Sequence, residues 1–229
     1  MDFCGLTKTS TLDYPGKIAA VLFAPHCNYD CFYCHNRALL EKEAPLMDPG
    51  EVADFLEKRR GLIDAVVLTG GEATLQGGLA DFAKTLQQKG YLVKLDTNGS
   101  NPNVVETLLA KKLLDYVALD YKAPWDRYRE ICGEGADPEA VQETLALLAG
   151  SGLDFELRTT VIPQLSEKDL IRMAKAVPKV PRFLLQQYKE PSYYKPEDQF
   201  RVKQKPYGLL TLIEMSGKIF DYQPGVAVR

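Results

Sequence analysis

The sequence lacks a long apolar run, because no stretch reaches the roughly 18–20 apolar residues that cross a bilayer. The N-terminal segment MDFCGLTKTS also lacks the basic and apolar regions of a signal peptide. We therefore expect no membrane association and a cytoplasmic location. The sequence also has no excess of positive charge, since the formal net charge of the 229 residues is −3. Nucleic-acid binding needs a concentrated basic face, so we expect no nucleic-acid partner.

Internal repeats, low-complexity runs and long linkers are also absent, which predicts one domain over residues 1–229. Short apolar or β-branched runs instead alternate with amphipathic segments. We expect strands at residues 17–23, 64–70, 91–99, 115–122, 155–162, 182–188 and 218–222, and helices at 48–60, 78–90, 103–112, 138–152, 166–177 and 206–216. Such alternation predicts an α/β fold with parallel strands, in either an open doubly wound sheet or a barrel-like sheet.

Two of these expected helices begin with a recognisable signal. Asp48 before Pro49 is typical of an N-cap followed by the first helical position. Ser166 stands three residues before Asp169, which is close to the capping-box pattern. We expect these two helices to start at these residues.

Cysteine is scarce, but three of the five cysteines fall in one short loop, HCNYDCFYCHN: Cys27, Cys31 and Cys34. The other two, Cys4 and Cys132, stand alone and are expected to be buried small apolar side chains. In a reducing cytosol, the cluster indicates metal binding or redox chemistry rather than a disulfide framework. A zinc site that adds His26 or His35 would make the chain a zinc-stabilised binding module, although structural zinc usually joins two separate segments. Three thiolates also suit an iron–sulfur cluster that keeps one iron open.

Polar residues gather where the expected strands end. At the carboxyl ends of four strands come the cysteine loop, Gly70-Gly71-Glu72, Asp96-Thr97-Asn98-Gly99, and Asp120 with Lys122. Ligands bind at this edge of the sheet in both candidate architectures. We therefore expect these four loops to form one site.

The spacing C-x₃-C-x-aromatic-C, with Tyr33 before Cys34, resembles the signature of the radical S-adenosylmethionine enzymes. The following His35-Asn36 and the upstream TLDYPGK (11–17) resemble the activating enzymes of glycyl-radical proteins. These include the activators of pyruvate formate-lyase and of anaerobic ribonucleoside-triphosphate reductase, and GLTKTSTLDYPGKIAAVLF is most similar to the second. The resemblance continues, in the same order, through GGEATLQ, LDTNG, LDYK, ELRTTVIP and FLLQQY.

This resemblance implies a fold and a reaction. The fold is a partial (β/α)6 TIM-like barrel with parallel strands, open on one side, in which the loop 24–36 holds the cluster and the segment 206–222 closes the barrel. The reaction is the reductive cleavage of S-adenosylmethionine to a 5′-deoxyadenosyl radical, which takes hydrogen from a glycine of a partner enzyme. Anaerobic ribonucleoside-triphosphate reductase is the expected partner, and flavodoxin or ferredoxin the expected electron donor. An alternative is an oxidoreductase of the same superfamily that acts on a small molecule, as the short deazapurine-forming relatives do.

The resemblance also implies roles for single residues. A 4Fe-4S cluster would be held by Cys27, Cys31 and Cys34. Glu72, beside Gly70 and Gly71, would accept hydrogen bonds from the amine of S-adenosylmethionine, while Lys122 and Arg158 would bind its carboxylate. The catalytic groups are thus expected to be Glu72, Lys122 and the three cysteines. Each residue also has a structural reading, because Gly-Gly is common in turns and Lys or Arg often forms a surface ion pair.

The remaining expected contacts surround the adenine and a cation. The Tyr33 ring and the backbone near His35 would contact the adenine. A place in the buried core would equally explain an aromatic residue at position 33. The pyruvate formate-lyase activator has a histidine at a strand end where this sequence has Gln187 and Tyr188, so we expect a phenol or amide contact there. Three oxygen-bearing residues resemble a site for Na⁺ or K⁺, although turn capping would also explain them: Asp96, Thr97 and Asp120.

Overall fold

The computed structural model describes residues 1–39 and 45–229. Its centre is an eight-stranded sheet in which the strands follow one another in chain order. The strands are β1 (Gly5–Ser10), β2 (Ala19–Ala24), β3 (Ala65–Gly70), β4 (Leu92–Thr97), β5 (Tyr116–Asp120), β6 (Phe155–Val161), β7 (Arg182–Gln187) and β8 (Val226–Val228). β2 to β8 pair in parallel, whereas β1 runs antiparallel to β2.

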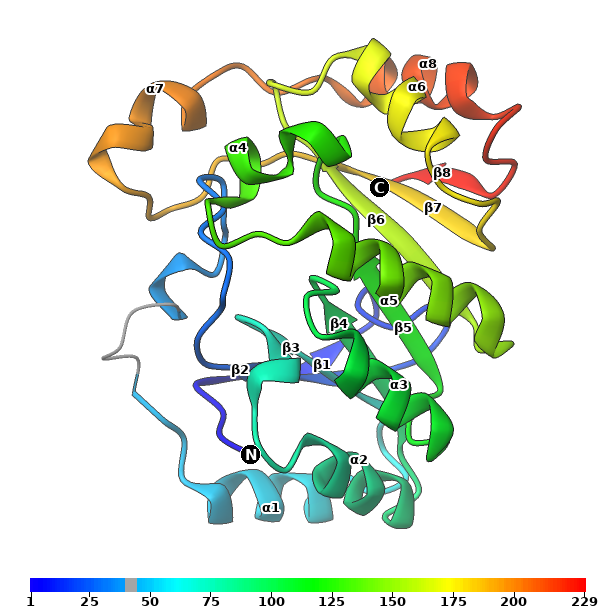
Figure 1. Cartoon of the computed structure of the whole chain (residues 1–229). Helices are drawn as coiled ribbons and strands as arrows, with labels where there is room; N and C mark the ends of the chain where they lie inside the picture. The colour runs from blue at the N-terminus through cyan, green and yellow to red at the C-terminus, as the bar shows by residue number, and fades with distance from the viewer. Residues whose placement is uncertain (40–44) are drawn as a thin grey trace.

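Helices connect the parallel strands, and the longer ones lie along the outside of the curved sheet (Figure 1). They are α1 (Pro49–Lys58), α2 (Leu79–Gln88), α3 (Pro102–Ala110), α4 (Tyr128–Cys132), α5 (Pro138–Ser151), α6 (Glu167–Lys175), α7 (Gln199–Val202) and α8 (Leu209–Ile219). Short 3₁₀ turns add η1 (Arg37–Leu39), η2 (Ala73–Leu75), η3 (Trp125–Arg127) and η4 (Pro196–Asp198). None of the helices in the described part of the chain combines the length and apolar character needed to cross a bilayer.

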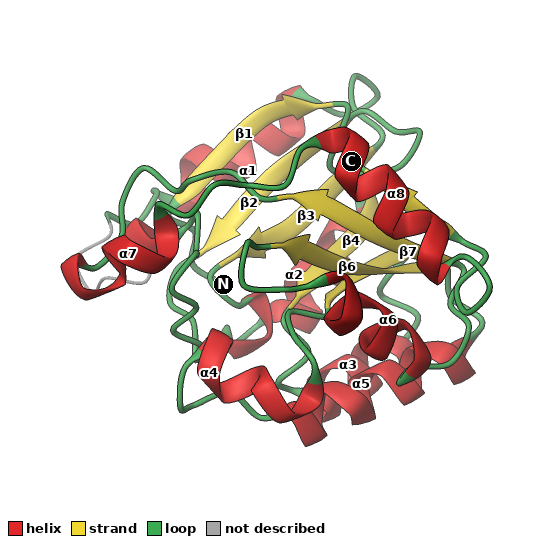
Figure 2. Ribbon diagram, turned by 90° about the horizontal axis from the view of Figure 1, so that it is seen from above, coloured by secondary structure: helices red, strands yellow, loops and turns green. Residues whose placement is uncertain are grey.

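The sheet curves like a barrel wall but does not close. β1 and β8 form its two ends, and the described residues contain no pairing between them. Figure 2 shows the curved sheet from above, with β1 at one end. The prediction of a partial, laterally open (β/α)6 barrel is therefore confirmed, with β2 to β7 as its six strands.

Side chains on the two faces of the strands form two separate apolar clusters. Leu22 and Leu68 point outward into a large core shared with the helices. Val21 and Val67, their neighbours in sequence, point inward because side chains alternate along a strand. Tyr14, from the segment TLDYPGK, joins this inner cluster with its ring centre 5.5 Å from that of Tyr116. Tyr14 of the TLDYPGK segment thus packs at the amino end of the barrel, opposite the loops that follow the strands.

The predicted helix starts are confirmed. The Asp48 side chain accepts hydrogen bonds from the first backbone N–H groups of α1, and Pro49 is the first helical residue. The Ser166 hydroxyl oxygen accepts a bond from the Asp169 N–H, and the Asp169 carboxylate accepts one from the Ser166 N–H. α6 therefore begins with a complete capping box.

The C-terminal prediction is wrong in part. Residues 218–222, expected to be a strand, instead contain the end of α8 and the turn after it, because Leu212, Met215 and Ile219 are buried at helical spacing. The last strand comes later, at Val226–Val228, and extends the sheet beyond β7 rather than closing the barrel. The antiparallel β1 was not predicted at all.

We expect Ser166→Ala to lower the free energy of unfolding by about 1 kcal/mol, because it removes the acceptor that caps the first turn of α6. Urea unfolding followed by circular dichroism measures this change. Lys168→Ala, an exposed position in the same turn, is the matched control and should leave stability nearly unchanged. Equal stabilities for the two variants would show that the capping box contributes nothing.

Candidate active site

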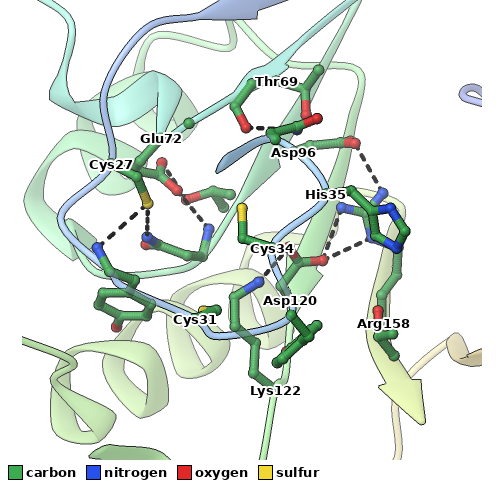
Figure 3. A pocket seen from close by; sticks show the side chains of 18 of the residues that line it. Cys27, Cys31, Cys34, His35, Thr69, Glu72, Asp96, Asp120, Lys122 and Arg158 are labelled. Carbon is green, nitrogen blue, oxygen red and sulfur yellow. Dashed lines mark hydrogen bonds and ion pairs between the residues drawn. The ribbon is translucent and has the colours of Figure 1, made fainter. Parts of the chain in front are cut away.

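The cysteine loop after β2 is held against the end of β3 by backbone hydrogen bonds. The Gly71 N–H donates to the Ala24 carbonyl at 2.8 Å, and the Glu72 N–H donates to the His26 carbonyl at 2.7 Å. The Asn36 side-chain amide donates to the Gly70 carbonyl at 2.9 Å, so the far side of the loop is held as well. These bonds hold the cysteine loop over the carboxyl ends of the strands (Figure 3).

Gly70 and Gly71 make this close approach possible. A Cβ on Gly71 would lie 1.8 Å from the His26 carbonyl oxygen, and one on Gly70 would lie 2.4 Å from the Ala24 backbone. Gly70 also has a φ of 119°, which strongly favours glycine. The resemblance puts these two glycines beside the residue that would bind the amine of S-adenosylmethionine. Both line the cavity, but their immediate steric partner is the cysteine loop itself.

A cavity lies between this loop and the carboxyl ends of the strands. Its polar side chains come from the ends of five consecutive strands, β3 to β7: Thr69, Asp96, Thr97, Asp120, Arg158, Thr160 and Gln186. The three loop cysteines, Glu72 and Lys122 line the same space. The four loops that were expected to meet therefore do meet.

The three cysteine thiols face this cavity from one loop. Burial raises the pKa of Cys27 to about 12 and also raises the pKa of Cys34. A hydrogen bond with Cys132, which is buried as expected, lowers the pKa of Cys31. In residues 1–39 and 45–229, no three His, Cys, Asp or Glu side chains lie close enough to hold one metal ion. The described residues thus present no ready set of three ligands for a single zinc ion, whereas in a four-iron cluster each thiolate binds a different iron atom.

Glu72 is buried, and its carboxylate is held by four donors. Its Oε1 accepts bonds from the Thr74 N–H at 3.1 Å, the Thr74 hydroxyl at 2.6 Å and the Thr97 hydroxyl at 2.8 Å. Its Oε2 accepts one bond, from the Asn98 N–H at 2.7 Å. Burial nevertheless raises the pKa of Glu72. A carboxylate oxygen has two lone pairs, so Oε2 can accept one further bond from a ligand.

A row of alternating charges crosses the inner face of β4, β5 and β6. Arg158 pairs with Asp96 at 2.9 Å and with Asp120 at 2.8 Å, and Lys122 pairs with Asp120 at 3.0 Å. Below them, Lys94 pairs with Asp96 at 2.8 Å and lies 3.8 Å from Glu156. Burial opposes ionisation of Asp120, but Arg158 and Lys122 outweigh it and lower its pKa to about 2. We infer that three cations and three carboxylates balance one another along the wall of the cavity and just below it.

The residues expected to bind Na⁺ or K⁺ do not fit a cation. The Arg158 guanidinium already lies between the Asp96 and Asp120 carboxylates. The Thr97 hydroxyl donates to Glu72 and accepts from the Gly99 N–H, so it is also engaged. We therefore assign no role to a monovalent cation.

The aromatic residues of the site divide into those that reach the cavity and those that do not. Tyr33 and His35 both line it. The buried Tyr33 hydroxyl has no hydrogen-bond partner within the described chain, which leaves it available to a ligand. Tyr188 lies elsewhere, because β7 ends at Gln187 and the Tyr188 hydroxyl donates to the Val202 carbonyl at 2.8 Å. Gln186 reaches the cavity in its place.

Several site residues were missed at the sequence level. Lys94 and Glu156 complete the row of charges, and a lysine inside an apolar strand was the available signal for the first. Asn98 was noted only as part of a turn, yet its amide nitrogen lies 3.7 Å from the Cys27 sulfur.

Known proteins resemble this chain in sequence over much of its length. Residues 21–177 match the model of the radical SAM superfamily, where SAM is S-adenosylmethionine. A protein of Methanocaldococcus jannaschii, named provisionally as a glycyl-radical enzyme activating enzyme, is 34% identical over 226 residues, which are 95% of this chain and 92% of that protein. The 7-carboxy-7-deazaguanine synthase of Clostridium acetobutylicum is 32% identical over 112 residues, covering 48% of this chain and 49% of that one.

Two solved structures show the same fold. SuiB of Streptococcus suis, bound to S-adenosylmethionine, aligns with a TM-score of 0.68 and 17% identity over 91% of this chain and 51% of that one. A spore photoproduct lyase variant aligns with a TM-score of 0.65 and 10% identity over 97% and 78% of the two chains.

We expect Gly71→Ala to prevent the cysteine loop from seating, because the new methyl group would occupy the place of the His26 carbonyl. Iron and sulfide content after anaerobic reconstitution should fall at least several-fold. Gly77→Ala is the matched control, since nothing lies within 4 Å of a Cβ at that position. Full iron content in the Gly71 variant would contradict this account of the glycine pair.

Proposed function

Because the chain belongs to the radical S-adenosylmethionine superfamily and, within it, to the glycyl-radical enzyme activating enzymes, we propose that it installs a glycyl radical on a partner enzyme. We propose anaerobic ribonucleoside-triphosphate reductase as that partner, and the cytoplasm as the place of reaction. One observation carries the proposal: three thiols of a single loop share a cavity with an acceptor carboxylate and two cations.

The donor set fits the cofactors of this family. Cys27, Cys31 and Cys34 would hold a 4Fe-4S cluster and leave one iron without a protein ligand. Once bound and reduced, such a cluster would supply the electron for the reductive cleavage of S-adenosylmethionine to methionine and a 5′-deoxyadenosyl radical, which would abstract hydrogen from the glycine of the partner to give 5′-deoxyadenosine. Flavodoxin or ferredoxin is the proposed source of that electron.

The protein itself would bind and orient the sulfonium ligand. Glu72 Oε2 is an acceptor for its amine, because only one of its lone pairs is engaged. Lys122 and Arg158 are the available cations for its carboxylate, and each would exchange part of its present pairing with Asp120. Tyr33, with its free buried hydroxyl, and the neighbouring His35 would form the adenine side.

The open side of the barrel supports a protein as the substrate. β1 and β8 do not pair with one another in the described residues, and we propose that a loop of another protein approaches the cavity from this side. Glycine suits such a substrate because its Cα carries no side chain and permits close approach.

A second candidate is a radical enzyme that acts on a small molecule of the deazapurine class. The match to 7-carboxy-7-deazaguanine synthase favours it, but this match covers only about half of each chain. Product analysis by mass spectrometry with the purified protein separates the two proposals.

We expect the reconstituted protein, with S-adenosylmethionine and a reductant, to produce a glycine-centred electron paramagnetic resonance signal on the reductase. Cys34→Ala should abolish this signal, because it removes a cluster ligand. Cys4→Ala is the matched control, since Cys4 lies near the start of β1 and contacts the Phe23 carbonyl instead. Cleavage of S-adenosylmethionine without any glycyl signal would refute the activating role and retain the superfamily.

Lys122→Met should weaken S-adenosylmethionine binding about tenfold or more, because a half-buried cation that would pair with the ligand carboxylate is lost. Calorimetry on the anaerobically reconstituted protein measures the dissociation constant. Lys84→Met, an exposed position on α2, is the control and should bind like the unchanged protein. Equal affinities for the two variants would remove Lys122 from the ligand site.

A further inference from the structure

We propose that Asn98 is a positioning residue for the cluster: its side-chain amide donates a hydrogen bond to the Cys27 sulfur and raises the reduction potential of the cluster. The inference depends on the proposed function only in that Cys27 carries iron. It assigns a role to a residue in the turn after β4, outside the cysteine loop.

The contact is built into a buried network. Asn98 is 4% exposed, and its Nδ2 lies 3.7 Å from the Cys27 Sγ and 3.0 Å from the Asn28 Oδ1. Its own Oδ1 accepts a bond from the Ser100 N–H at 2.9 Å. Because the oxygen is held by Ser100, the amino group must face Cys27, so the hydrogen-bond network fixes the orientation of the amide.

The Cys27 sulfur receives donors from two sides, as the dashed lines at this residue show (Figure 3). One is the Tyr29 backbone N–H at 3.4 Å, which belongs to the cysteine loop. The other is the Asn98 side chain, which comes from the turn after β4. Hydrogen bonds to cluster sulfurs stabilise the more negative, reduced state more than the oxidised state, so they raise the reduction potential.

Asn98 also connects the cluster to the proposed ligand acceptor. Its backbone N–H donates to Glu72 Oε2 at 2.7 Å, while its side chain reaches Cys27. The residue that helps to orient Glu72 therefore also contacts a cluster ligand. A movement of this turn would therefore change the contacts of both Glu72 and Cys27.

The test is an anaerobic redox titration of the reconstituted protein, without partner enzyme or S-adenosylmethionine. We expect Asn98→Ala to make the midpoint potential more negative, with a loss of about fivefold in the equilibrium constant for one-electron reduction. Asn98→Asp should lower it further, because this variant retains the Ser100 acceptor but turns a negative oxygen toward the sulfur. Asn101→Ala is the matched control, since Asn101 lies in the same turn and donates to Thr74 rather than to sulfur.

An unchanged potential in both Asn98 variants, at full iron content, would overturn the proposal. If Asn98→Ala loads too little iron for a titration, the midpoint potential of Asn98→Asp is the deciding measurement. This variant keeps the shape and the backbone contacts of the turn. The result is separable from the proposed function: a protein that shows these shifts but activates no reductase would refute only the activating role.

Discussion

The seating of the cysteine loop on the glycine corner after β3 is the contact on which the site depends. The His26 and Ala24 carbonyls occupy the volume where side chains at residues 70 and 71 would be, and both carbonyls accept backbone hydrogen bonds there. The three thiols can only face the strand ends because this crossing is so close. Glu72 follows at once, so the contact that places the cysteines also places the acceptor carboxylate beside them.

Charge balance along the wall of the cavity and just below it is the second constraint. Buried ions are costly unless they are paired, and each cation of the row contacts at least one carboxylate. We infer a row that is neutral as a whole when the site holds no ligand. A ligand carboxylate would add one negative charge, which Lys122 and Arg158 can meet only by loosening their hold on Asp120. Through that exchange Arg158 can pair with buried carboxylates in the empty site and with the ligand carboxylate in the occupied one. Because its guanidinium lies between Asp96 and Asp120, no additional cation fits there.

Much of this arrangement was predictable from the sequence, for physical reasons that also explain the failures. The six strands β2 to β7 were predicted because buried parallel strands are continuous apolar runs, and Asp48 and Ser166 marked helix starts because caps are local. The meeting of the four loops followed from the rule that parallel strands present their carboxyl ends at one edge. The partners of Arg158 and Asn98 could not be predicted, because they depend on the register of separate strands. The prediction for Tyr188 was wrong for a similar reason, because the exact end of β7 determines which side chain reaches the cavity.

The edge strand β1, which the sequence pattern did not reveal, adds a reason for the stability of the site. β1 pairs with β2 through Gly5 and Phe23, so β2 has a strand on both sides. An unpaired β2 would leave the chain free to shift just before the cysteine loop, and edge strands are open to such slippage. With β2 internal, the loop leaves from a fixed point and meets Gly71 in a fixed register. The barrel can therefore stay open between β1 and β8 without loosening the loop that carries the thiols.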